Sequence, residues 1–163
     1  MWRNLIVLLL ALLSLPTFSN EAIKLTKTQL APEIDGILDD IVWQKAEKFT
    51  GFKSFIPDFG KEMPQKTESW ISYDEENLYF AFRCYDDEPD KIIATIRNRD
   101  DIGKEDWVCV NLDSHNDQQA ISAFYVNPFG IQADARFAAG QEDESADFVW
   151  YSAGQIEEQG YTI

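Results

Sequence analysis

The sequence of 163 residues is poor in the side chains on which metal centres and nucleophilic catalysis usually depend. It contains one histidine, two cysteines and two methionines. The histidine, His115, lies in a turn-like stretch, and no serine or cysteine nucleophile has an evident base beside it. A haem group would need methionine or histidine ligands, for which only Met63 and His115 remain after residue 19. These residues therefore indicate neither a catalytic nor a haem-binding site.

Basic residues are also scarce. There are 14 Lys and Arg against 29 Asp and Glu, which gives a formal charge of −15. Nucleic acids and anionic membrane surfaces bind proteins that place Lys and Arg against phosphates, so neither is an expected partner. Aromatic residues, by contrast, are plentiful: 11 Phe, 6 Tyr and 5 Trp. A disordered acidic tail is thereby excluded, and the length fits one folded domain.

Only one long apolar run is present, at residues 5–13, after a short basic start at Arg3. It is too short to cross a bilayer, which needs about 20 residues. Thr17 and Ser19 are small residues at the positions that a signal peptidase reads. We therefore predict a signal peptide at 1–19.

Cleavage there would leave a domain at 20–163, exported to the periplasm or associated with the outer membrane. It would remove Arg3 and no acidic residue, taking the formal charge from −15 to −16. An oxidising compartment permits a disulfide between Cys84 and Cys109. Alternation, however, places Cys84 on the apolar face of its strand and Cys109 on the opposite face of its own. If both strands lie in one sheet, the sulfur atoms point apart, which predicts two free thiols.

Short alternating stretches separated by turn residues fill the domain and predict mostly β structure. The expected strands are 22–25, 67–73, 78–85, 107–112, 121–127, 131–137 and 148–151. A short helix is expected at 39–46 and an irregular loop at 49–64. The fold class is thus an all-β, antiparallel β-sandwich with one short helix. Because 160–163 alternates like the opening of a strand, we also expect the chain to be a fragment that lacks its C-terminal strands.

Several segments, in order along the chain, carry a resemblance to a known family. They are 34–40 with Trp43 and Ala46, then 71–79, 106–113, 124–127 and the pair Gly160 and Tyr161. Together they resemble the family 9 carbohydrate-binding modules and a wider group of sugar- or haem-binding β-sandwiches. The most similar version stands at the front of large exported proteins whose remainder is an uncharacterised domain expected in the outer membrane.

The resemblance implies a non-catalytic module that binds an oligo- or polysaccharide and serves carbohydrate catabolism. The C-terminal remainder of the parent protein would be its second partner. A structural calcium ion is also implied, and the acidic loops offer oxygen ligands, although the spacing singles out no ligand set.

Alternation predicts one sheet face that gathers aromatic and hydrogen-bonding side chains. Such a face suits sugars, because the C–H side of a pyranose lies on an aromatic ring while its hydroxyls need polar partners. The predicted sugar-binding residues are Trp70, Tyr79, Arg83, Trp107, Tyr125 and Asn127. The alternative is that loops or the rest of the protein cover this face.

The sugar clamp of the family does not carry over to this chain. In those modules two Trp clamp a terminal sugar while a Glu and an Arg bind its hydroxyls. Here Gly103 falls near the first Trp position, Cys109 at the Glu and Tyr125 at the Arg, and the second Trp would lie past residue 163. Two alternatives therefore stay open: a structural or interaction domain that has lost the sugar site, or the binding part of a glycoside hydrolase with its catalytic residues beyond residue 163. This segment alone is not expected to be an enzyme.

Overall fold

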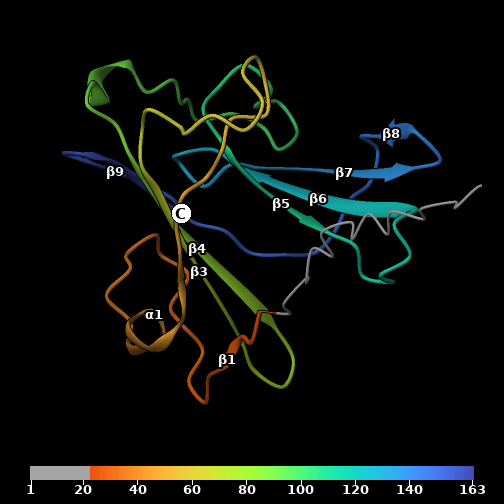
Figure 1. Cartoon of the computed structure of the whole chain (residues 1–163), viewed down its shortest axis with the longest axis horizontal. Helices are drawn as coiled ribbons and strands as arrows, with labels where there is room; N and C mark the ends of the chain where they lie inside the picture. The colour runs from red at the N-terminus through yellow and green to blue at the C-terminus, as the bar shows by residue number, and fades with distance from the viewer. Residues whose placement is uncertain (1–22) are drawn as a thin grey trace, which may run out of the picture.

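The computed structural model describes residues 23–163, so the predicted signal peptide at 1–19 lies outside the described residues. Two β-sheets, one short helix and a 3-10 turn (η1, Pro89–Lys91) make up a β-sandwich-like fold, which confirms the predicted class (Figure 1). Among these residues, no helix has the length and apolar character needed to cross a membrane.

The first sheet has the order β1-β3-β4-β10-β9, with β2 also pairing with β3. Its strands are β1 (Thr26–Lys27), β2 (Lys48–Phe49), β3 (Thr67–Tyr73), β4 (Leu78–Tyr85), β9 (Gln155–Glu157) and β10 (Gly160–Thr162). The second sheet has the order β5-β6-β7-β8. Its strands are β5 (Val108–Leu112), β6 (Ala120–Val126), β7 (Gln132–Ala138) and β8 (Gln141–Asp143). All pairs are antiparallel except β1 with β3.

The β3–β4 hairpin forms with the predicted bounds because its turn satisfies its own polar groups. Asp74 Oδ1 accepts the backbone N–H groups of Glu76 and Asn77, each at 2.8 Å. The Tyr79 hydroxyl donates to Asp74 Oδ2 at 2.5 Å. This hydrogen bond and the two backbone bonds lower the pKa of Asp74 to about 2. The acidic turn therefore has a structural role.

The helix α1 (Ile41–Lys45) covers one face of the first sheet. It is shorter than the predicted 39–46, and Asp40 at its N-terminus makes no side-chain capping bond. Trp43 is only 7 % exposed and forms a buried cluster with Val42 and Ala81. In Figure 1 the helix lies on one side of β3 and β4, while the four-stranded sheet lies on the other.

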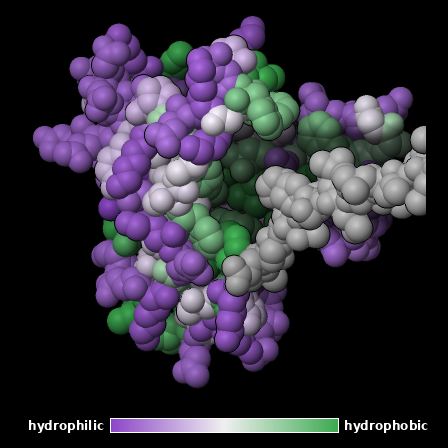
Figure 2. Space-filling model, viewed as in Figure 1, coloured by the Kyte–Doolittle hydropathy of each residue, from purple (hydrophilic) through white to green (hydrophobic). Residues whose placement is uncertain are grey.

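Apolar side chains gather between the two sheets. Phe80 and Phe82 alternate with Ala81 along β4, so they lie on the face of the first sheet that α1 does not cover. Across from them, Phe124 of β6 packs against Phe148 and Trp150, with ring centroids 5.3 Å apart in both pairs. Figure 2 shows this apolar region as a hollow between the sheets.

The predicted strand at 148–151 does not form. Side chains, rather than a neighbouring strand, satisfy its backbone: Arg99 donates to the Phe148 carbonyl at 2.7 Å and Gln132 to the Trp150 carbonyl at 3.1 Å. Within this apolar run, Phe148 and Trp150 pack on Phe124, while Val149 and Tyr151 are exposed.

Other boundaries also differ from the sequence prediction. The first strand is 26–27 rather than 22–25, and the loop at 49–64 contains an antiparallel bridge between Lys53 and Glu62. The three-residue strands β8 and β9 were missed, whereas β10 forms where 160–163 alternates. Cys84 and Cys109 are both free thiols, as predicted. They lie in different sheets, however, rather than on opposite faces of one sheet.

Glu68 of β3 is a buried carboxylate held by two lysines. Its Oε1 lies 2.9 Å from Lys48 Nζ and 2.7 Å from Lys66 Nζ, and the Tyr85 hydroxyl lies 3.2 Å from its other oxygen. The hydrogen bonds from Lys66 and Lys48 lower its pKa from 4.5 to about 2, against the opposing effect of burial. The negative charge of Glu68 is therefore a stabilising feature of this sheet.

The stability of the protein should depend on pH through Glu68. Because its pKa is depressed in the fold, its contribution is complete above pH 4.5 and is lost as the pH falls towards about 2. We expect Glu68→Gln to lower the free energy of unfolding at pH 7 by about 1–3 kcal/mol, a range reduced by the exposure of both lysines. Urea unfolding at pH 7, 4 and 2.5 measures this. Glu75→Gln is the control, since Glu75 is exposed and pairs only with Lys27. An unchanged pH slope in the Glu68 variant would contradict the assignment.

Candidate functional site

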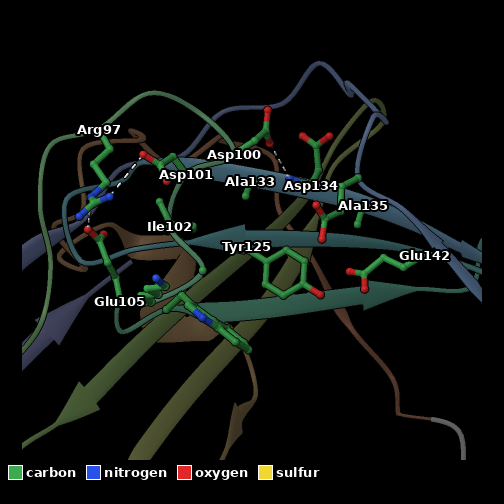
Figure 3. A pocket seen from close by; sticks show the side chains of 14 residues that line it. Arg97, Asp100, Asp101, Ile102, Glu105, Tyr125, Ala133, Asp134, Ala135 and Glu142 are labelled. Carbon is green, nitrogen blue, oxygen red and sulfur yellow. Dashed lines mark hydrogen bonds and ion pairs between the residues drawn. The ribbon is translucent and has the colours of Figure 1, made fainter.

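A pocket of about 530 Å³ lies on the outer face of the second sheet, away from the first sheet (Figure 3). The register of β6 and β7 puts Tyr125 beside Ala133, with Ala135 on the same face, while Phe124 points the other way. Residues 97–107 form one wall of the pocket. Two alanines on β7 thus leave the space that larger side chains would fill.

Two aromatic side chains meet at right angles in this pocket. The rings of Trp107 and Tyr125 have centroids 5.1 Å apart and an interplanar angle of 87°. Trp107 immediately precedes β5 and is 44 % exposed, so its ring is open to a ligand. Burial, with the neighbouring Cys109 and the carboxylates of Glu142 and Glu144, raises the pKa of Tyr125 to about 12. Its hydroxyl therefore stays protonated at neutral pH and can donate a hydrogen bond.

Ion pairs and hydrogen bonds around Glu105 hold the wall at 97–107 in place. Its buried carboxylate lies 2.9 Å from Arg97 Nε and also accepts hydrogen bonds from Thr95 and Asn127. Burial raises the pKa of Glu105, but these hydrogen bonds outweigh burial and lower the pKa overall. Arg97 also pairs with Asp101 at 3.3 Å, as the dashed lines in Figure 3 show.

Asn127, one of the predicted sugar contacts, is fully buried and already uses its polar atoms. Its amide donates to the Thr95 carbonyl at 3.1 Å and to Glu105 at 2.7 Å. Its oxygen accepts the backbone N–H groups of Phe129 and Ile131 at 3.0 and 2.9 Å. The structure thus makes Asn127 an anchor of the pocket wall rather than a group that a ligand can reach.

The predicted sugar-binding face is split between two sheets. Trp70 and Tyr79 pack against the cluster around Trp43, so α1 covers them. Arg83 lies opposite Thr162 of β10, beside a separate small pocket of about 160 Å³. The assumption of one shared face is wrong because β4 pairs with β10 and not with β5. Of the six predicted residues, the structure brings together only Trp107 and Tyr125 in the larger pocket.

Sequence reasoning missed several residues that line this pocket. Arg97, Asp100 and Asp101 come from a segment without regular structure, and Glu142 comes from β8. Acidic stretches at these positions were visible in the sequence, but only the β7–β8 pairing brings Glu142 to the face that carries Tyr125.

The part of the chain that the structure describes offers no metal centre. Within residues 23–163, no group of three or more His, Cys, Asp or Glu side chains is arranged to hold an ion. The calcium ion that the resemblance implies is therefore given no ligands.

Gly103, at the family's first Trp position, does line the pocket, and Cys109, at the Glu position, pairs with Tyr125 across the β5–β6 ladder.

Compared with models of protein families, with curated proteins and with solved structures, the chain matches none.

Proposed function

We propose that this chain is a non-catalytic carbohydrate-binding module of an exported protein, and that the pocket at Trp107 and Tyr125 is its binding site. The observation that carries the proposal is the perpendicular aromatic pair inside a pocket of about 530 Å³. That volume lies within the roughly 300–1,000 Å³ typical of small-molecule sites. The resemblance to family 9 carbohydrate-binding modules supports the same conclusion.

The pocket supplies both kinds of contact that a sugar ring needs. The open ring of Trp107 offers an apolar surface for the C–H side of a pyranose. The Tyr125 hydroxyl donates a hydrogen bond, and the carboxylates on the rim accept hydrogen bonds from sugar hydroxyls. The site is proposed to bind its sugar without catalysis, as the resemblance implies. Hydrolysis of O-glycosyl bonds would belong to the remainder of a parent protein in the periplasm or outer membrane.

One other surface favours the second candidate, a structural or interaction domain. The tip of the loop at 52–63 exposes Phe55, Ile56 and Phe59 by 74, 78 and 80 %. The loop is ordered, since the Ser54 N–H donates to the Lys61 carbonyl at 2.8 Å. An ordered apolar tip of this kind is typical of surfaces that contact another molecule.

Replacing Trp107 with alanine tests the proposed site. We expect the protein to bind one or more sugars on a glycan array, and the variant to lose at least about tenfold in affinity, because truncating an aromatic hot-spot residue costs about 2 kcal/mol or more. Isothermal titration with the best array sugar measures the loss. Tyr151→Ala is the matched control, since Tyr151 is an 81 % exposed aromatic outside the pocket. Binding to no glycan by the folded protein would reject the function, and equal losses in both variants would reject the site.

A further inference from the structure

We infer that the ligand of this pocket is cationic: an oligosaccharide of glucosamine units, whose free amino groups are protonated. The inference rests on the proposed function, because it names the class of sugar that the Trp107–Tyr125 pocket selects. It starts from the aromatic pair and is decided by the charges that surround it.

The lining of the pocket is strongly negative. Six carboxylate residues and two basic residues line it. One of the bases, Arg97, is already paired with Glu105 and Asp101. Lys104 is the other base, so the lining carries more carboxylates than its two bases can neutralise. This charge attracts a cationic sugar more strongly than a neutral one and repels an acidic one.

Two of these carboxylates are available to a ligand. Among the described residues, Glu142 and Glu144 take part in no ion pair, whereas Asp134 is occupied by Arg99. Both glutamates line the same pocket as Tyr125 and are close enough to influence its hydroxyl electrostatically.

The register of the strands puts Glu142 on the aromatic side of the sheet. Glu142 lies opposite Phe137, which shares its face with Ala135 and Ala133 of β7, and Ala133 pairs with Tyr125. Figure 3 shows the Glu142 carboxylate and the Tyr125 hydroxyl directed toward one another. A ligand group seated against the aromatic pair would therefore lie beside an unpaired carboxylate.

An ammonium group uses both parts of this arrangement. A cation within about 6 Å of an aromatic centroid is attracted by the face of the ring, most strongly by tryptophan. The open ring of Trp107 provides that face, and the glutamates provide the counter-charge and hydrogen-bond acceptors. Glucosamine combines such an ammonium with a pyranose whose C–H side stacks on the aromatic surface.

The test compares three β-1,4-linked hexamers that differ only at carbon 2 with one acidic hexamer, hexagalacturonate, whose units are α-1,4-linked. Isothermal titration at pH 5.5 and low salt would use hexamers of glucosamine, N-acetylglucosamine and glucose, together with hexagalacturonate. We expect the glucosamine hexamer to bind at least about tenfold more tightly than the two neutral ones, and hexagalacturonate not to bind. The preference should shrink as salt rises, because ion pairing is screened. Equal affinity for glucosamine and glucose hexamers would overturn the inference and leave the proposed function standing.

Variants separate the pocket from the general acidity of the protein. Glu142→Gln with Glu144→Gln should reduce glucosamine-hexamer affinity about tenfold and glucose-hexamer affinity by much less, because a Gln amide oxygen still accepts a hydrogen bond from a hydroxyl but carries no charge. Glu157→Gln with Glu158→Gln is the matched control, since this pair lies at β9 of the other sheet, outside the pocket. If Trp107→Ala still binds the glucosamine hexamer at full strength, the attraction is non-specific and the inference is overturned. Failure to bind any sugar would overturn the proposed function with it.

Discussion

Replacing Asp134 with alanine should lower the free energy of unfolding by about 3 kcal/mol, the lower end of the cost of breaking a buried ion pair, because the Arg99 side chain is 32 % exposed. The side chain of Asp134 is fully buried and pairs with Arg99. It also accepts the Trp150 indole N–H at 3.0 Å and the Phe148 backbone N–H at 3.4 Å. Removing it leaves the Arg99 guanidinium without its main partner and leaves two donors unsatisfied.

Urea unfolding of the wild type and the variant measures the effect of Asp134. Asp147→Ala is the matched control, because Asp147 lies 3.4 Å from the same guanidinium but is 83 % exposed. We expect that control to change stability by less than about 1 kcal/mol. Replacing Asp134 and Arg99 together with leucine and methionine should recover part of the loss, since no charge then remains buried. Similar losses from Asp134→Ala and Asp147→Ala would show that the pair contributes little.

Trp43→Ala should destabilise the protein by about 3–5 kcal/mol, the range for removing a large aromatic side chain from a core. Trp43 is the largest member of the cluster between α1 and the first sheet, and its loss would leave a cavity beside Ala81. It would also uncover Trp70 and Tyr79, which pack against this cluster.

The same substitution at Trp107 is the control for Trp43, because it removes the same atoms from a half-exposed position. Chemical unfolding should show a loss of less than about 1 kcal/mol for Trp107→Ala. The two tryptophans would then have distinct roles, because Trp43 would affect stability and Trp107 would affect binding. A loss of under about 1 kcal/mol for Trp43→Ala would contradict its place in the core.

Patterns in the sequence predicted those elements that are stabilised by interactions between residues close together in the chain. The β3–β4 hairpin was predicted with its exact bounds because alternation over 67–73 and 78–85 and the Asp74 turn act within a short stretch of chain. The segment at 148–151 is a short run of apolar residues and was also predicted as a strand, yet it is no strand. Its backbone partners are side chains of Arg99 and Gln132, which lie 49 and 18 residues away in sequence.

The residues of the candidate site also fall into those that the sequence could predict and those that it could not. Trp107 and Tyr125 could be predicted because β5 and β6 are adjacent in the chain and pair with each other. Trp70, Tyr79 and Arg83 were assigned to the same face on the assumption of one sheet. In the structure β4 pairs with β10 instead, and α1 covers Trp70 and Tyr79.

The sequence by itself determined that this is an acidic, aromatic-rich all-β domain with a short helix. Composition and period-two alternation are sufficient for that, because burial of apolar side chains drives both. Only the tertiary structure decided which faces are covered and which carboxylates surround the aromatic pair. Strand order and the packing of α1 depend on contacts between residues far apart in the chain. Alternation within a strand shows that a face is apolar, but it does not show which element packs against that face.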